Sequence, residues 1–289
     1  MPPSMLVPEL GRPGIVRMVV QRQPDTRIHC IRSDGTVMLG IFDSNENVLC
    51  WSEITTAGLI EDAVVLPGQN GVTEDQVYYV VNRAVNGSTV RFLEKWALEV
   101  ECRGDTLNKQ ADAFVTGTQA PSTTISGISH LEGATVICWH DGVCESDATT
   151  GAIKTFVVSG GTITGLATAA TSYVVGLTYI AKWQSTKLGE ATGQSPALGA
   201  KKNMAGLGVI CAYFHPKGIQ YGNTFDAMYD MPEVEGSVVI DPNTIRTSYD
   251  EQAFYLDGGW TTDLRLCLQS QAPRPVTIMA AVCDSDVTQ

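Results

Sequence analysis

The chain has 289 residues and a formal net charge of −12, with 44% hydrophobic and 17% charged residues. Its length allows roughly two or three domains with buried cores. The charge argues against binding of nucleic acid through phosphate neutralisation, because the 19 basic residues are scattered and only Lys201 and Lys202 form a doublet. We expect no membrane span, because no apolar run approaches the roughly 18 residues that one needs.

Residues 1–105 show the alternation of apolar and polar side chains that half-buried antiparallel strands require. Turn signals close the runs, and Asn86-Gly87 is the strongest because a type I′ turn needs positive φ at both central residues. Strands with such even spacing are typical of sandwiches, barrels and propeller blades. The predicted strands are Ile15–Val20, Arg27–Ile31, Val37–Phe42, Val48–Ile54, Ala63–Leu66, Val77–Arg83 and Thr89–Trp96.

The second domain is predicted over residues 106–183. Residues 106–121 interrupt the alternation and end in proline, so we place a boundary there. Between Thr123 and Tyr179 the apolar runs are short, and Asp141-Gly142 and Gly160-Gly161 are two-residue hairpin turns. Several short strands in so small a segment predict a small β-barrel.

The third domain is predicted over residues 184–289. Residues 184–203 are polar, small and rich in glycine, which predicts a long loop or linker. Strand-like runs follow, and a β-sandwich is their simplest arrangement. These runs are Met204–Phe214, Ser237–Ile240, Asp263–Gln269 and the segment from Pro273 to Asp284.

The predicted fold class is therefore all-β: propeller-like antiparallel strands, then a small β-barrel, then a C-terminal β-sandwich. We find no convincing amphipathic helix in the sequence, although Leu98–Ala113 has room for a short one.

The eight cysteines favour free thiols in a reducing compartment over a disulfide scaffold. No CxxC pair occurs, and most cysteines lie inside apolar runs, where a cysteine behaves as a small buried hydrophobe. They are Cys30, Cys50, Cys102, Cys138, Cys144, Cys211, Cys267 and Cys283.

The nearest candidate for chemistry is the segment from Cys138 to Cys144, which includes His140 and Asp141. In a strand, Cys138 and His140 point to the same face, so a thiolate–imidazole pair is conceivable. Cys138, His140 and Cys144 also offer three zinc ligands, but zinc favours four. The structural interpretation is simpler: Cys138 is a core residue, His140 leads into the turn and Asp141-Gly142 forms it.

Other polar residues carry weaker signals. His29 alternates to the face opposite Cys30 and is predicted to be exposed, and His215 is predicted to cap a strand end. Glu233-Val234-Glu235 and Asp284-Ser285-Asp286 do not match a calcium-binding loop and are predicted to be solvated turns. No phosphate-binding glycine motif follows a strand and opens a helix.

The tryptophans are Trp51, Trp96, Trp139, Trp183 and Trp260, and four of the five lie in or beside apolar strand runs. Exposed aromatic residues on a β-scaffold can stack on sugars, but strand-borne ones usually pack a core, and we favour core packing. The sequence thus predicts no catalytic residue, no cofactor-binding residue and no metal ligand, and a protein that is not an enzyme.

Six segments in one order carry a resemblance to a known family: Ile31–Gly58, Asp75–Trp96, His130–Gly142, Phe156–Thr164, Tyr173–Tyr179 and Leu264–Val282. In this order the chain resembles the C-terminal portion of the tail nozzle proteins of podoviruses, also called tail tubular protein B or stabilization protein. The segments cover most of residues 25–283. Each motif is weak alone, and the shared order gives the resemblance its specificity.

The resemblance implies a structural virion protein of a short phage tail. Such a protein assembles as a ring, expected to be a hexamer, which continues the channel for DNA ejection. Expected partners are further copies, other tail proteins such as the adaptor and tail fibres, and viral DNA that passes without specific binding. The protein would be made and assembled in the host cytoplasm. The acidic balance suits a channel wall to which DNA does not adhere.

Residues 15–96 supply about seven strands, too few to close a propeller of four or more blades. The missing strands must come from a partner chain, or the first domain is a smaller open sheet with edges that a neighbour covers. The alternative function is a β-rich adhesin or glycan-binding module of a phage tail or cell surface. Exposed Trp and Tyr side chains along one groove would favour that alternative, whereas a symmetric ring with a pore would favour the nozzle.

Overall fold

The computed structural model describes residues 11–43, 48–189, 191–192, 195–196, 199–231, 234–235, 238–239, 244–254 and 259–287. The chain is 58% strand and 3% helical, so the prediction of an all-β fold is confirmed. Two compact units are present, and we describe each by itself. Unit 1 is Met1–Leu98 with Ser129–Ala134 and Val158–Gly161, and unit 2 is Glu99–Ile128, Thr135–Val157 and Thr162–Gln289.

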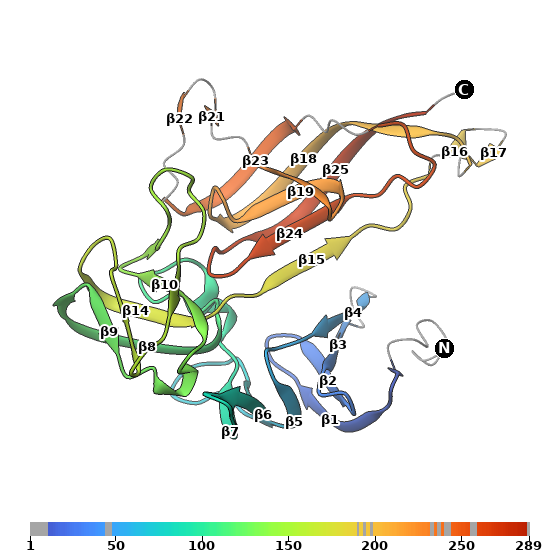
Figure 1. The fold of residues 1–289 in the computed structure, drawn as a ribbon. Helices are drawn as coiled ribbons and strands as arrows, with labels where there is room; N and C mark the ends of the chain where they lie inside the picture. The colour runs from blue at the N-terminus through green and yellow to red at the C-terminus, as the bar shows by residue number, and fades with distance from the viewer. Residues whose placement is uncertain are drawn as a thin grey trace. The chain divides into compact units, whose positions relative to one another are not determined.

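Unit 1 contains two antiparallel sheets, and in both of them the strands lie in chain order (Figure 1). All seven strands predicted between residues 15 and 96 are present. The four-stranded sheet consists of β1 (Ile15–Gln21), β2 (Thr26–Arg32), β3 (Val37–Asp43) and β4 (Val48–Ile54). The three-stranded sheet consists of β5 (Leu59–Leu66), β6 (Gln76–Val85) and β7 (Ser88–Lys95).

One face of each of these sheets contributes to a shared core. Ile31 and Val37 of the first sheet are buried in one cluster with Ile60, Val77 and Val81 of the second. The period of two along each strand brings these side chains to the same side. The predicted turn at Asn86-Gly87 is confirmed: φ is 47° at Asn86 and 75° at Gly87.

The first part of unit 2 contains a five-stranded sheet in the order β11-β10-β14-β8, with β12 paired to β10, and a separate pair, β13 with β9. No closed barrel is found in the part of the chain that the structure describes. The strands are β8 (Asp112–Ser122), β9 (Thr124–Ser126), β10 (Thr135–His140), β11 (Val143–Cys144), β12 (Thr155–Val157), β13 (Thr162–Thr164) and β14 (Ala170–Leu177).

The prediction that residues 106–121 interrupt the strands is wrong from Asp112 onward, because β8 begins there and pairs with β14. This strand ends its sheet and none of its side chains is fully buried, so few apolar residues mark it in the sequence. Both predicted turns have the expected backbone. φ is positive at Asp141 and Gly142 (49° and 86°) and at Gly160 and Gly161 (60° and 67°).

The later part of unit 2 contains two further sheets, ordered β15-β24-β19-β20 and β23-β18-β25. The strands are β15 (Ile180–Gln184), β18 (Lys202–Phe214), β19 (Ile219–Thr224), β20 (Ala227–Asp230), β23 (Arg246–Phe254), β24 (Cys267–Gln271) and β25 (Thr277–Val287). Two short pairs join β16 (Ala191–Thr192) to β17 (Ser195–Pro196) and β21 (Val234–Glu235) to β22 (Val238–Val239).

Buried side chains of both sheets form one core. Met204, Leu207 and Val209 of β18 cluster with Ile219 of β19 and Leu268 of β24. The strand predicted at Met204–Phe214 is therefore present. Strand structure starts only at Cys267 within the run predicted over Asp263–Gln269, and Ser237 and Ile240 lie outside the described residues.

The segment predicted as a loop, residues 184–203, contains the short strands β16 and β17 and the start of β18, and residues 190, 193–194 and 197–198 lie outside the described residues. Helical structure is limited, among the described residues, to short 3-10 segments that include η2 (Glu99–Cys102) and η3 (Ser129–Leu131). In the described chain we find no helix with the length and hydrophobicity of a transmembrane span.

Candidate functional site

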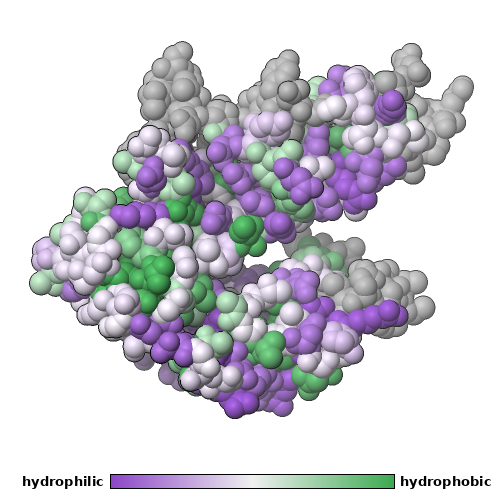
Figure 2. Space-filling model, viewed as in Figure 1, coloured by the Kyte–Doolittle hydropathy of each residue, from purple (hydrophilic) through white to green (hydrophobic). Residues whose placement is uncertain are grey.

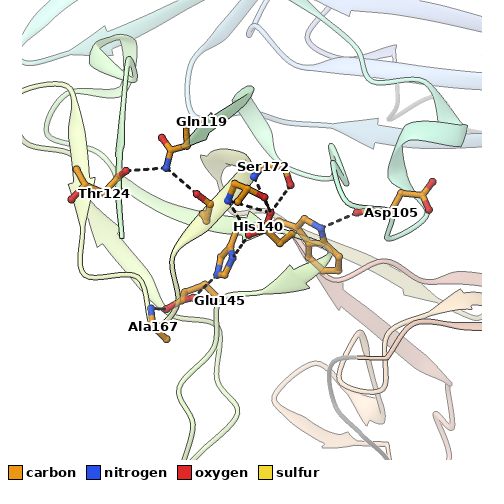
Figure 3. Close-up of polar contacts among 11 residues, drawn as sticks. Asp105, Gln119, Thr124, His140, Glu145, Ala167 and Ser172 are labelled. Carbon is orange, nitrogen blue, oxygen red and sulfur yellow. Dashed lines mark hydrogen bonds and ion pairs between the residues drawn. The ribbon is translucent and has the colours of Figure 1, made fainter. Parts of the chain in front are cut away.

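A buried polar cluster surrounds the hairpin of β10 and β11, where sequence analysis placed the candidate chemistry (Figure 3). His140 Nε2 lies 2.8 Å from Glu145 Oε2, a hydrogen bond in which the imidazole donates to the carboxylate. The side chains of His140 and Glu145 are 2% and 3% exposed. This pair is thus removed from solvent, where a charged group requires a partner.

The Glu145 carboxylate holds the cluster together. Its Oε1 atom accepts hydrogen bonds from the backbone N–H of Ala167 (2.8 Å) and from Lys154 Nζ (3.2 Å). Burial favours the neutral acid, but the hydrogen bonds from His140, Ala167 and Lys154 outweigh it and lower the pKa of Glu145. The ionised carboxylate therefore joins the hairpin to residues 154 and 167.

Asp141 makes a second set of hydrogen bonds at the turn itself. Its Oδ1 atom accepts from Thr171 Oγ1 (2.6 Å), from the backbone N–H of Ser172 (2.8 Å) and from Ser172 Oγ (2.9 Å). Burial opposes ionisation, but the bonds from Thr171 and Ser172 hold the pKa of Asp141 far below its usual value. The carboxylate thus ties the turn to the beginning of β14.

The thiolate–imidazole pair considered for Cys138 and His140 gains no support from this geometry. Cys138 is 0% exposed, and burial, with the negative charge of Glu145 nearby, raises the pKa of the thiol far above its usual value. The Nε2 atom of His140 is bonded to Glu145. A neutral buried thiol is a poor nucleophile, so the structural interpretation of Cys138 is favoured.

The three zinc ligands considered in the same hairpin do not converge. Cys144 is paired with Trp139 across the hairpin, and the two side chains pack together with Val174. Cys138 and His140 alternate to the other face of β10. Among the described residues no group of three His, Cys, Asp or Glu side chains could hold a metal ion.

Sequence analysis missed Glu145, although a signal for it was present. With the two-residue turn Asp141-Gly142, His140 pairs with Val143 and Trp139 with Cys144. Counting two further residues places Glu145 on the face of His140. The register of the hairpin therefore identifies the partner of the histidine.

The loop that follows Glu145 is fixed by Arg274, which is 8% exposed. Its guanidinium donates to Ser146 Oγ (3.1 Å) and to the carbonyl of Gly151 (2.5 Å). Asn108 Nδ2 donates to the carbonyl of Pro273, one residue before this arginine (2.7 Å). These bonds join the loop after Glu145 and the segment around Asn108 to the connection between β24 and β25, which indicates a structural role.

The prediction that His29 is exposed is wrong, because its side chain is 0% exposed. Its Nδ1 atom lies 2.6 Å from the Tyr79 hydroxyl, and Nε2 lies 3.3 Å from Gln21 Oε1. Burial and the nearby charge of Arg27 lower the pKa of His29 to about 4. The alternation identified the face correctly, but this face packs on the second sheet of unit 1.

His215 lies at a strand end as predicted, and there its Nδ1 atom accepts the backbone N–H of Lys217 (3.0 Å). The ring is 2% exposed and meets Trp139 edge-on, with the ring centroids 6.4 Å apart. Burial, with the charges of Arg274 and Lys217, lowers the pKa of His215 to about 3.

Two of the tryptophans, Trp96 and Trp139, follow the prediction of core packing, and the other three do not. Trp139 is 0% exposed and its Nε1 donates to the carbonyl of Asp105 (3.0 Å). Trp96 packs against the core of unit 1, and Trp51 is half-buried. Trp183 and Trp260 are 52% and 48% exposed. Trp183 is exposed because β15 is an edge strand with all five residues exposed.

All eight cysteines are free, and five of them are buried, as expected for core residues: Cys30, Cys138, Cys144, Cys211 and Cys267. Cys50 also lies in an apolar run, but it is exposed, so the expectation of a buried hydrophobe is wrong there. Asp284 and Asp286 belong to β25 and are exposed, so the prediction of a turn there is wrong. Glu233 lies outside the described residues.

Exposed apolar side chains on edge strands are the other notable feature of the surface. Val16 and Met18 of β1 and Leu93 of β7 are more than half exposed, as are Met279 and Val282 of β25. Each of these strands ends its sheet in the described part of the chain. Figure 2 shows apolar surface, in green, among polar surface on the visible side of each unit. Open edges with apolar side chains are typical of surfaces that another chain covers.

A scan against protein-family models found no match for this chain, and a search of curated proteins found none.

Proposed function

We propose that the chain is a structural component of a short phage tail, which forms part of the nozzle ring around the DNA-ejection channel. The exposed apolar side chains on the edge strands β1, β7 and β25 carry this proposal. Such edges suit a protein whose neighbouring subunits cover them in an assembly. The order of the segments that resemble podovirus nozzle proteins supports it. The net charge of −12 supports a channel wall that does not retain DNA.

In this proposal the finer architecture is that of the resembling family. The two sheets of unit 1 are blades of a propeller that further strands complete, the sheets around β10 form a small barrel-like domain, and the two later sheets of unit 2 form a sandwich. The shared core of those two sheets supports the sandwich. The ring is a homo-oligomer, expected to be a hexamer, that contacts the adaptor and tail fibres.

The proposed protein acts without catalysis. This part of the proposal rests on the hairpin cluster, where Cys138 is buried and the carboxylates of Asp141 and Glu145 are occupied by hydrogen bonds within unit 2. In this proposal these groups serve to hold the fold.

The test is the mass of the native assembly, measured for the purified chain alone and together with candidate tail proteins. We expect a closed ring of several copies, and the same chain in purified virions. A compact monomer at high concentration, together with its absence from virus particles, would refute the nozzle.

A second candidate function is a glycan-binding module, which the exposed Trp183 and Trp260 favour. Exposed indole rings can stack on the apolar face of a sugar. This candidate requires that Trp183→Ala or Trp260→Ala abolish binding to a glycan array, with unfolding temperature unchanged. If the wild-type chain binds no glycan on such an array, the candidate is excluded.

A further inference from the structure

Two turns of unit 1 contain the same pair of residues, an asparagine followed by a glycine. Asn70-Gly71 lies between β5 and β6, and Asn86-Gly87 lies between β6 and β7. Their backbones match: φ is 56° and 82° at the first pair, and 47° and 75° at the second. Positive φ at both central residues is typical of a type I′ turn. The two turns are therefore a matched pair within one molecule.

An asparagine before a glycine is a site of spontaneous chemistry, because glycine has no side chain to shield its amide nitrogen. That nitrogen attacks the Cγ atom of the asparagine and forms a new C–N bond. The side-chain nitrogen leaves as ammonia, with the proton of the attacking amide, and a five-membered succinimide remains. One water molecule then opens the ring at either carbonyl, so that asparagine and water give aspartate or isoaspartate and ammonia.

Solvent access does not distinguish the two sites. All four residues are exposed. A Cβ built on Gly71 or on Gly87 would meet no atom within 4 Å. The folded turn, however, opposes the reaction at both sites. In a type I′ turn ψ of the first central residue is about +30°, which places the next amide nitrogen on the side of the Cα–C bond away from Cβ. The ring therefore closes only after the turn has opened.

The turn at Asn86 is held closed by strand pairing. It joins Val85 directly to Ser88, and these two residues are paired with each other. The pairing of β6 with β7 continues from there without a register shift to Tyr78 and Lys95. β6 is also the central strand of its sheet. Opening of this turn therefore acts against the end of a continuous ladder.

The turn at Asn70 is held by much less. Residues 67–75 connect β5 to β6 and belong to neither strand. In the described part of the chain, the bond from the Val72 N–H to the Gln69 carbonyl (3.1 Å) is the only backbone–backbone hydrogen bond of residues 69–72. Exposed backbone with few hydrogen bonds opens locally at low free-energy cost. Loss of this one bond frees ψ of Asn70.

We propose that Asn70 is a deamidation site of the native chain and that Asn86, in the same dipeptide, is protected. Opening precedes the reaction, so the rate at each site follows the population of its open turn. Deamidation of Asn70 adds one negative charge to the loop between β5 and β6. The isoaspartate product also inserts a methylene group into the backbone and removes the type I′ turn. This modification goes beyond the proposed nozzle and does not depend on it.

The experiment incubates the native full chain in a mildly alkaline buffer and follows both asparagines by peptide mass analysis. A parallel sample unfolded in urea gives the intrinsic rates. We expect Asn70 to convert at least about tenfold faster than Asn86 in the native chain, which corresponds to a difference of about 1.4 kcal/mol in the free energy of opening. In urea the two asparagines should convert at similar rates.

The matched control is Asn70→Gln, which keeps an uncharged amide but has to close a larger ring. We expect this variant to lose the fast product and to keep the slow conversion of Asn86. Equal native rates at the two sites, or a faster rate at Asn86, would overturn the inference. A native chain in which neither site reacts, while both react in urea, would overturn it as well, because both turns would then be protected. The nozzle is decided separately by the mass of the native assembly.

Discussion

Two buried histidines, one in each unit, are held by different chemistry. His29 in unit 1 has neutral partners, the Tyr79 hydroxyl and the Gln21 amide. His140 in unit 2 has a carboxylate partner, Glu145, which also accepts from Lys154. A buried neutral cluster is destabilised when it gains a charge, whereas a buried charged cluster is destabilised when it loses one partner. The two clusters should therefore fail under different perturbations.

Removal of the carboxylate from unit 2 should have the largest effect. In Glu145→Ala the buried His140 loses its partner, and the backbone N–H of Ala167, an exposed residue, loses its acceptor. We expect the free energy of unfolding to fall by about 3–5 kcal/mol, as for other buried pairs with one partner removed. Urea denaturation measures this.

The matched control is Glu145→Gln, which keeps the volume and one acceptor oxygen but not the charge. The free energy of unfolding of Glu145→Gln should lie between those of wild type and Glu145→Ala. An unfolding midpoint for Glu145→Ala equal to that of wild type would mean that the carboxylate does not hold the cluster.

Acid should destabilise the cluster around His29 in unit 1. The pKa of His29 is about 4 in the folded chain, against about 6.5 for an unperturbed histidine. Between these values the unfolded chain binds the proton and the folded chain does not, so stability is present above pH 6.5 and is lost as pH falls toward 4. The expected total is about 3 kcal/mol. His215, which lies in unit 2, has its pKa lowered to about 3, so unit 2 also loses stability as the pH falls below 6.5.

The measurement is the urea midpoint as a function of pH for wild type and for His29→Gln, which cannot take up the proton. Between pH 4 and 6.5, the free energy of unfolding of the variant should depend less steeply on pH than that of wild type. The difference in slope should correspond to the uptake of about one proton. An unchanged slope would show that His29 is not held neutral by burial. The carboxylates Asp141 and Glu145 of unit 2 affect stability at lower pH, because their pKa values are lowered. Their contribution is lost only as the pH falls below about 4.

A smaller effect is expected at the turn beside the unit 2 cluster. Asp141→Asn keeps a residue type that tolerates the φ of 49° but removes the charge and one acceptor oxygen. We expect a loss of about 1 kcal/mol at pH 7, discounted because the carboxylate is partly solvated. The loss should vanish at a pH where Asp141 is protonated in the wild type. A full loss that persists in acid would point to a packing defect instead.

The comparison of the two clusters also explains what the sequence could predict. The period of two and the turn residues located all seven strands of unit 1 and the face of His29, but a period does not report whether a second sheet covers that face. β8 was missed because an edge strand with no fully buried side chain needs no apolar alternation. Glu145 was within reach of the hairpin register. The clustering of Arg274 with Ser146 was not, because it joins residues 128 positions apart.

The last prediction concerns the reactivity of two thiols, Cys50 and Cys138, and involves no change of stability. Cys50 lies exposed on β4, whereas Cys138 is buried in the unit 2 cluster with a thiol pKa raised far above its usual value. Because the thiolate is the reactive form, a maleimide should label Cys50 within the native chain and leave Cys138 unmodified until urea unfolds it. Peptide mass analysis after a short pulse separates the two sites, with Cys50→Ser as the control that removes the fast signal. Native labelling of Cys138 at the rate of Cys50 would mean that the hairpin opens, and a thiol–imidazole site would then have to be reconsidered.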